Sequence, residues 1–308
     1  MGKNVFLFSG QGSQYVGMGK ELCERYPQAK AVFDTASSVL GYDIAEIAFN
    51  GPEEELGKTI NSQPAIMACS LAAFEAARAE GIEFDGVAGH SLGEYAAMVA
   101  AGVVTMEDGF KLIKARAAAM QKAADSSDGA MYAIIGLDAA QVEKVCEETE
   151  GYVTAVNYNS AVQTVIAGET KACEAAAEKF TAMKKRAIKL GVSSAFHSKL
   201  MQPAADEFIE AAKQISFKAA EKEFYSNVLG AKLEDFSNMP ELLARHIVSP
   251  VRFTSELECM NKAGYENFIE LGPNKVLTGL VKKTLKGANA VNIENAATLE
   301  KALAALGE

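Results

Sequence analysis

The stretch Val87-Ala88-Gly89-His90-Ser91-Leu92-Gly93-Glu94, VAGHSLGE in one-letter code, places a serine between two glycines that each lie two residues away from it. The apolar residues before the serine predict the end of a buried strand, and segment 92–101 after it predicts a helix. On such a sharp turn the serine hydroxyl projects away from the sheet, and a side chain at either glycine would clash. The pattern predicts an α/β fold with a nucleophilic Ser91; an ordinary glycine-rich turn with an N-capping serine is the alternative.

Two backbone turns are suited to stabilise an oxyanion. The amide of Leu92 lies at the predicted helix N-terminus, where negative charge is stabilised. The turn Gly10-Gln11-Gly12 follows the apolar strand 5–8, and a glycine turn in this place can donate an amide to an oxyanion hole. A nucleotide site is excluded there, because a GxGxxG motif would need glycine at Tyr15 and no GxxxxGK[ST] motif occurs in the chain.

A nucleophilic serine needs a base, and the chain has only three histidines. His90 is adjacent to Ser91, so its side chain is expected to point elsewhere. His197 is favoured, because it begins a predicted helix over 198–213 and shares that helix's apolar face. A helix N-terminus disfavours the imidazolium and would keep this ring neutral. His246 stays the second candidate, and a buried core histidine is the structural alternative for either residue.

One arginine lies on the wrong face of its helix. Lys111, Lys114 and Lys122 share the polar side of the segment 107–124, whereas Arg116 falls within the apolar stripe. A buried guanidinium stays charged and must be paired. Its partner is either an acidic residue of the same chain or the carboxylate of a ligand held in bidentate fashion. The pattern alone favours the first of these two interpretations.

Strands and helices alternate along the chain, which predicts a mainly parallel sheet covered on both faces. Segment 130–190 differs, because its order is β-α-β-β-α-β, the split βαβ or ferredoxin-like unit. We therefore expect a large α/β subdomain from residues 1–125 and 193–308 and an inserted ferredoxin-like small subdomain from residues 126–192. The elements on which this rests are strands at 130–135, 152–157, 162–167, 184–190 and 268–271, and helices at 17–25, 64–79, 107–124, 138–149, 170–181, 198–213 and 276–285.

Composition excludes several classes of function. The formal net charge of −10 and the absence of a dense basic run argue against a nucleic-acid partner. No apolar run reaches the roughly 18 residues that span a bilayer, and the N-terminus is no secretory signal, so we expect a cytoplasmic protein without a membrane partner. The five cysteines never form a CxxC pair, which argues against disulfides and against a metal site. Nothing demands an oligomer, so we expect a monomer.

Several motifs, in this order, are together similar to one family. They are GQGSQ at 10–14, GHSLGE at 89–94, the internal Arg116, NYNS at 157–160, AFHS at 195–198, SPVRF at 249–253 and ELGPxxVLTGL at 270–280. On these residues the chain resembles the malonyl-CoA:acyl carrier protein transacylase family over nearly its whole length. The resemblance implies a hydrolase-like α/β core with a ferredoxin-like insertion, and no cofactor beyond the phosphopantetheine carried by the partner protein.

The resemblance also implies roles for single residues. Ser91 would be the nucleophile and His197 the base, the amides of Gln11 and Leu92 the oxyanion hole, and Arg116 the clamp on the malonyl carboxylate. The family usually has glutamine where this chain has His246, and a carbonyl there orients the catalytic histidine. The implied reaction moves the malonyl group from malonyl-CoA to holo acyl carrier protein through a malonyl-serine, in fatty acid biosynthesis.

Two other functions stay open at this point. A serine esterase or thioesterase shares the serine turn but would normally place an acidic residue and then a histidine late in the chain. A non-catalytic module that binds the carrier protein would keep the fold without forming an adduct. An acidic carrier would need a local basic patch, and the candidates are Lys184, Lys185, Arg186 and Lys189, or Lys282, Lys283 and Lys286.

Overall fold

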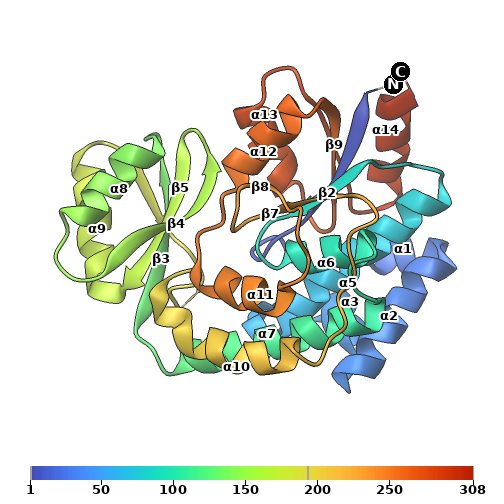
Figure 1. Ribbon diagram of the computed structural model, residues 1–308, viewed down its shortest axis with the longest axis horizontal. Coiled ribbons are helices and arrows are strands. Elements are labelled where there is room, and N and C mark those ends of the chain that lie inside the picture. The colour runs from blue at the N-terminus through green and yellow to red at the C-terminus, as the bar shows by residue number, and fades with distance from the viewer. Residues whose placement is uncertain (1, 193, 308) are drawn as a thin grey trace.

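The computed structural model describes residues 2–192 and 194–307, which form two sheets with their helices (Figure 1). Sheet A has six strands in the order β10-β9-β1-β2-β7-β8. All neighbouring strands are parallel except β8, which runs antiparallel to β7. Its strands are β1 (Lys3–Phe8), β2 (Gly86–Gly89), β7 (Glu223–Ser226), β8 (Ala231–Lys232), β9 (Tyr265–Leu271) and β10 (Asn289–Ile293).

Helices cover both faces of sheet A, as the alternation of elements predicts. The four apolar residues of β1 and all of β2 are buried, which is typical of central strands in a parallel sheet. The helices are α1 (Lys20–Arg25), α2 (Pro27–Leu40), α3 (Ile44–Asn50), α4 (Glu53–Gly57), α5 (Thr59–Ala79), α6 (Gly93–Ala100), α7 (Met106–Asp125), η1 (Lys199–Met201), α10 (Gln202–Ala212), α11 (Met239–Val248), α12 (Phe253–Lys262), α13 (Val276–Thr284) and α14 (Ala296–Gly307).

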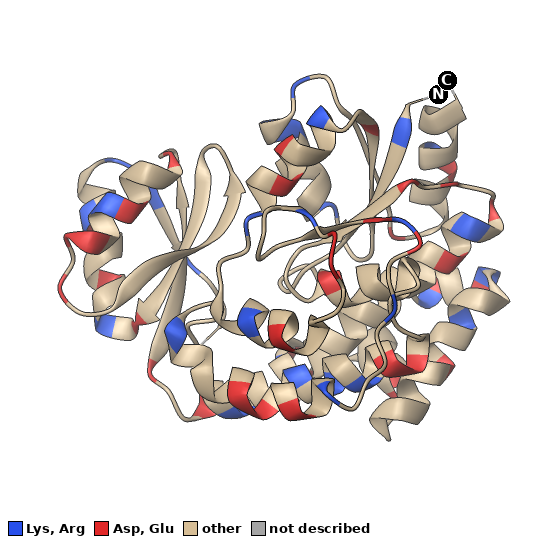
Figure 2. Cartoon of the chain, viewed as in Figure 1, with Lys and Arg blue, Asp and Glu red and all other residues tan. Residues whose placement is uncertain are grey.

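Sheet B is a separate antiparallel sheet in the order β4-β5-β3-β6. Its elements follow one another as β-α-β-β-α-β, as the sequence predicts: β3 (Gly129–Ile135), α8 (Ala139–Glu147), β4 (Val153–Ser160), β5 (Gln163–Glu169), α9 (Thr170–Ala182) and β6 (Arg186–Lys189). All of them lie inside residues 126–192, although the division into subdomains stays a prediction. Figure 2 shows charges on α8 and α9, whereas the strands β3, β4 and β5 are almost free of them.

The two faces of sheet B have different neighbours. One face packs against α8 and α9 in a core of its own, which includes Ile134 and Ile166. The other face contributes Met131 and Val165 to the main core around sheet A. Backbone hydrogen bonds join β4 to the chain before α12, from the Tyr158 amide to the Val251 carbonyl at 2.9 Å and from the Val251 amide to the Val156 carbonyl at 2.8 Å. Sheet B is therefore joined to the larger part of the molecule through β4.

Two predicted helices differ from the structure because of proline. The helix predicted over 64–79 begins at Thr59, so Pro64 lies inside it. Proline cannot donate a hydrogen bond to the Ile60 carbonyl, and the Tyr42 hydroxyl donates one instead at 3.4 Å. The helix predicted over 198–213 is divided into η1 and α10, because Pro203 sits in the first turn of α10. Among the described residues, no helix is both long and apolar enough to cross a membrane.

Candidate active site

Ser91 occupies the turn between β2 and α6 with a backbone φ of 54°. A non-glycine residue with positive φ is strained, typically by about 1–3 kcal/mol, and such strain clusters at functional sites. Both flanking glycines are required because a side chain at either position would clash with nearby backbone. A Cβ on Gly89 would lie 2.1 Å from the carbonyl carbon of Gly93, and one on Gly93 would lie 2.1 Å from the Phe8 carbonyl oxygen. The predicted reason for the two glycines is confirmed, and β1 is the close neighbour of the second.

His197 is the histidine that meets Ser91. Its Nε2 lies 2.7 Å from the Ser91 hydroxyl oxygen, and its side chain is buried. Nδ1 lies 3.0 Å from the His246 carbonyl and 3.1 Å from the Ser249 carbonyl. Because carbonyl oxygens only accept hydrogen bonds, Nδ1 carries the proton and Nε2 is left to accept one from Ser91. The geometry is that of a nucleophile with its general base.

The imidazole of His197 is kept neutral, but not for the reason that the sequence suggests. Burial is the largest cause that lowers the pKa of His197, to about 3, and the positive charge of Arg116 lowers it further. The two carbonyls at Nδ1 act in the opposite direction. His197 itself precedes η1, a single three-residue turn, so a helix N-terminus is not the cause.

Arg116 reaches the same hydroxyl from α7. Its Nη2 donates to the Ser91 oxygen at 3.1 Å and its Nη1 donates to the Gln63 Oε1 at 2.8 Å, with the side chain fully buried. The guanidinium also lies over the ring of Tyr95, 5.3 Å from its centroid. No salt bridge within residues 2–192 and 194–307 includes Arg116, and its Nε has no partner there. The buried ion pair that the pattern favours is therefore absent from the described residues.

The remaining predicted site residues surround Ser91. Gln11 lines a cavity of about 370 Å³ together with Ser91 and His197. Leu92 precedes the first residue of α6, and its side chain is buried. Within the part of the chain that the structure describes, neither the Gln11 nor the Leu92 backbone amide is paired with another residue. Two free backbone donors near a nucleophile are what an oxyanion hole requires.

The other two histidines have separate roles. The Nε2 of His90 bonds to Asn159 Oδ1 at 2.8 Å, and its ring packs on Phe253, so it is not the base for Ser91. The backbone carbonyl of His246 lies 3.0 Å from Nδ1 of His197, the position expected for the orienting role that the family resemblance implies. The side chain of His246 is buried and bonds instead to Asn227, with Nε2 3.1 Å from Oδ1.

Two polar residues at the site are missed by the sequence analysis. Gln63 lies on α5 directly after the buried polar residues Asn61 and Ser62 and just before the helix predicted over 64–79, so no amphipathic pattern marked it. Asn227 follows β7 and contacts the Ser91 amide at 2.7 Å, but nothing in the local sequence distinguishes it. Both contacts join segments that are distant in the chain.

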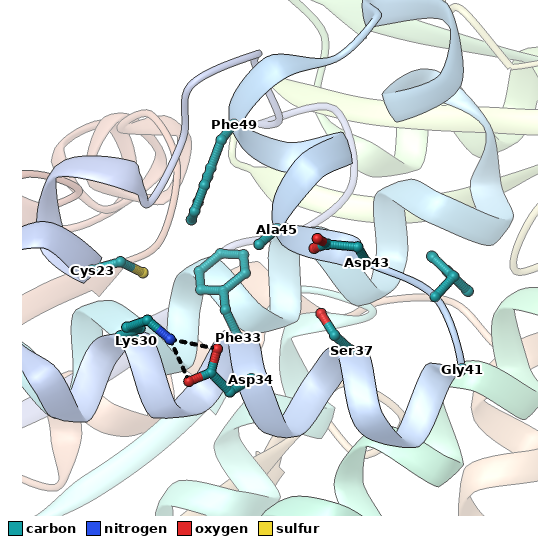
Figure 3. A pocket seen from close by; sticks show the side chains of 10 residues that line it. Cys23, Lys30, Phe33, Asp34, Ser37, Gly41, Asp43, Ala45 and Phe49 are labelled. Carbon is teal, nitrogen blue, oxygen red and sulfur yellow. Dashed lines mark hydrogen bonds and ion pairs between the residues drawn. The ribbon is translucent and has the colours of Figure 1, made fainter.

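A larger hollow of about 570 Å³ lies elsewhere, between α2 and α3 (Figure 3). It shares no lining residue with the cavity at Ser91. Two of its charged residues, Lys30 and Asp34, bond to each other at 2.6 Å, as Figure 3 shows, and Asp43 also lines it. Its described lining residues contain no hydrogen-bonded pair of nucleophile and base, so the cavity at Ser91 is the better candidate for the active site.

Comparison with known proteins agrees with this geometry. The model of the acyl transferase domain family matches residues 5–304. The malonyl CoA-acyl carrier protein transacylase of Bacillus subtilis strain 168 is 40% identical over 312 residues, which cover 100% of this chain and 98% of that protein. The crystal structure of the transacylase of the same name from Clostridium perfringens has a TM-score of 0.95 at 40% identity, covering 99% of this chain and 97% of that one.

A second solved structure is the complex of a type II PKS acyl-carrier protein with its malonyl-transacylase. It has a TM-score of 0.94 at 38% identity and covers 98% of this chain and 99% of that one. The similarity thus extends over both sheets and the whole site. The chain belongs to the acyl transferase domain family, among the malonyl CoA-acyl carrier protein transacylases.

Proposed function

We propose that this protein transfers the malonyl group from malonyl-CoA to the phosphopantetheine thiol of acyl carrier protein, in fatty acid biosynthesis. A single observation carries the proposal: the Ser91 hydroxyl oxygen lies 2.7 Å from the base His197 and 3.1 Å from the cation Arg116. A nucleophile, a neutral base and a buried cation without a carboxylate partner match an acyl group that ends in a carboxylate.

In the first half-reaction, His197 Nε2 takes the hydroxyl proton as the Ser91 oxygen attacks the thioester carbonyl carbon. The backbone amides of Gln11 and Leu92 hold the resulting oxyanion, each contributing roughly 3 kcal/mol in the transition state. The C–S bond then breaks, the sulfur of CoA takes the proton from His197, and a malonyl ester remains on Ser91. In the second half-reaction the carrier thiol gives its proton to His197, attacks the ester, and releases Ser91 with that proton.

Arg116 supplies the preference for a diacid. Among the described residues its guanidinium donates to two neutral oxygens, those of Gln63 and Ser91. A malonyl carboxylate would form charge-assisted, bidentate hydrogen bonds with it, whereas an acetyl group would leave the buried cation without a counter-charge. The same cation beside the Ser91 oxygen favours the negative charge that develops there during proton transfer.

The carrier protein would approach along a groove beside the cavity. The groove encloses about 480 Å³ and shares Gln11 and His90 with the cavity at Ser91. Lys275 and Lys283 line it, and Figure 2 shows basic residues on α13. Of the basic candidates named from the sequence, Lys283 lines the groove and Lys189 lines the cavity. An acidic carrier would be attracted there despite the net charge of −10.

The proposal is tested by intact-protein mass after mixing with malonyl-CoA. The parental protein gains one malonyl group and loses it to holo acyl carrier protein, whereas Ser91→Ala gains none. An esterase or thioesterase would release free malonate instead of charging the carrier, and a binding module would form no adduct. That Nδ1 of His197 meets two backbone carbonyls rather than a carboxylate disfavours the esterase. A monomeric enzyme in the cytoplasm stays a prediction.

A further inference from the structure

The side chain of Asn227 lies beneath the Ser91 turn and is fully buried. Its Oδ1 accepts a hydrogen bond from the Ser91 amide at 2.7 Å, and its Nδ2 donates to the Gly89 carbonyl at 2.6 Å. A backbone amide only donates and a carbonyl only accepts, so these two contacts determine which way the side-chain amide points. Asn227 thus holds the strained turn from both sides of the nucleophile.

The same side chain makes two further hydrogen bonds. Its Oδ1 lies 3.1 Å from His246 Nε2, which therefore carries a proton, and its Nδ2 donates to Glu256 Oε1 at 2.7 Å. The backbone amide of Asn227 donates to Glu94 Oε2 at 3.2 Å. His246, Glu256 and Glu94 are all buried. Every polar atom of the Asn227 side chain is consequently committed to this network.

The contacts form a closed circuit around the catalytic pair. The Ser91 amide bonds to Asn227, and Asn227 bonds to the His246 ring. The carbonyl of the same His246 bonds to Nδ1 of His197, whose Nε2 returns to the Ser91 hydroxyl. The position of the nucleophile's backbone and the position of the base are therefore linked through one asparagine.

We infer that Asn227 is a positioning residue, which sets the strained backbone of Ser91 and, through His246, the carbonyl that orients His197. This inference rests on the proposed function of Ser91 and His197. A displacement of about 1 Å between reacting groups costs on the order of 100-fold in rate. The role therefore predicts a loss in the acylation step rather than in binding, because among the described residues no hydrogen bond joins Arg116 to Asn227.

The test is single-turnover malonylation of Ser91, followed by intact mass, in Asn227→Leu. Leucine has a similar size but makes none of the four side-chain hydrogen bonds. We expect the acylation rate to fall by about 100-fold, with the KM for malonyl-CoA within about threefold of the parental value and the folded far-UV spectrum kept.

Asn267→Leu is the matched control. Asn267 also uses both ends of its amide, with Asn4 and Asn289 at 2.9 Å each, but it lies across β1, β9 and β10 away from Ser91. The Asn267→Leu substitution should lower thermal stability while leaving the acylation rate within about threefold of the parental rate. A folded Asn227→Leu that acylates within threefold of the parental rate would overturn the positioning role.

The hydrogen bond between Asn227 and the His246 ring can also be removed by His246→Leu, which deletes the ring but keeps the backbone carbonyl. We expect a loss of about tenfold or more, and a smaller loss in His246→Gln, whose amide again offers a donor to Asn227. Combining His246→Leu with Asn227→Leu should be no slower than Asn227→Leu alone, and multiplying losses would contradict the circuit. If Asn227→Leu does not fold, His246→Leu alone tests the positioning role. An acylation rate of His246→Leu within threefold of the parental rate would then overturn that role.

The two proposals fail in different ways. If the parental protein forms no malonyl ester on Ser91, the proposed function is wrong. If the parental protein is acylated and the Asn227 and His246 variants are acylated equally fast, the function stands and only the positioning role of Asn227 is wrong.

Discussion

Sheet A and sheet B both border the cavity at Ser91, but they contribute different things to it. The carboxyl ends of three neighbouring strands of sheet A are followed by the Gln11 turn, by Ser91 and by Asn227. Sheet B contributes wall residues such as Met131 and Asn157, and turns its other face to α8 and α9 (Figure 1). The reacting hydroxyl requires a strained backbone held on several sides, whereas a wall requires only shape.

The difference is also visible in how each region is held. At Ser91, a Cβ on either flanking glycine would collide with backbone, so the local path of the chain admits almost no change. In sheet B, residues such as Ile166 pack side chain against side chain in a separate core. We therefore expect changes near sheet A to alter chemistry, and changes on the helix side of sheet B to alter stability.

The largest effect is expected from His197→Gln. Glutamine fills part of the space but cannot act as a base, so single-turnover acylation of Ser91 should fall by about 10⁴-fold or more. Quenched reactions analysed by intact mass measure this rate. A residual rate within tenfold of the parental one would show that another group accepts the proton.

Arg116→Ala should alter the choice of acyl group. Losing a buried, charge-assisted contact typically costs about 2–5 kcal/mol, so kcat/KM for malonyl-CoA should fall by roughly 30- to 5,000-fold. The ratio of acetyl to malonyl transfer should rise, because an acetyl group has no carboxylate to lose. Measuring kcat/KM with both thioesters checks this, and equal losses for the two would remove Arg116 from the specificity role.

Ile166→Ala tests the sheet B side of the comparison. Ile166 is fully buried between sheet B and its helices, so the deletion should lower the free energy of unfolding by about 3 kcal/mol. Acylation per folded molecule should stay within about threefold. Urea unfolding measures the free energy of unfolding, and active-site titration measures acylation per folded molecule. Gly89→Ala provides the contrast, because acylation should be lost in it. Loss of chemistry in Ile166→Ala would mean that sheet B does more than form a wall.

The smallest effect concerns pH. The pKa of His197 is lowered to about 3 by burial and then by Arg116, so the neutral base persists as the pH falls through 6.5. Acylation at pH 5.5 should stay within about threefold of its rate at pH 7.5, whereas a histidine of ordinary pKa would lose about tenfold. Arg116→Ala should move the acid limb to higher pH. A full tenfold drop in the parental protein, with the fold intact, would contradict the burial of His197.

The same lowered pKa has a consequence for stability. The folded state binds fewer protons at His197 than the unfolded chain does between the two pKa values. Its contribution to stability is therefore complete above the unfolded pKa of about 6.5 and is lost progressively as the pH falls below it. Far-UV spectra recorded at pH 5.5 and pH 7.5 show whether the protein stays folded, and so separate a loss of stability from a loss of acylation rate.

Local patterns in the sequence were enough for the centre of the site. The contact between Gly89 and Gly93 joins residues four apart, so the turn and Ser91 are readable in one short stretch. His197 was favoured because it shares the apolar face of the helix predicted over 198–213, but His246 stayed a candidate, and only the 2.7 Å contact with Ser91 in the structure separates the two. The order of elements in segment 130–190 likewise predicted sheet B, because hydrophobic alternation and helix periodicity are local properties.

Elements without a local signal were missed. The short strands β7 and β10 have few residues in which alternation can be read, and neither was named in advance. The helix predicted from Pro64 begins at Thr59 instead, and the hydroxyl of Tyr42 bonds to the Ile60 carbonyl that proline leaves without its helical donor. The role of Arg116 needed the family resemblance, since periodicity alone favoured an ion pair.

The sequence by itself determined the glycine-flanked turn at Ser91 and the presence of a second sheet, because each depends on neighbours along the chain. Only the tertiary structure decided which groups meet Ser91. Gln63, Asn227 and the His246 carbonyl come from α5, from the end of β7 and from α11. Their hydrogen bonds close loops of many residues, and pairing over such distances is set by the packing of the whole chain rather than by any local pattern.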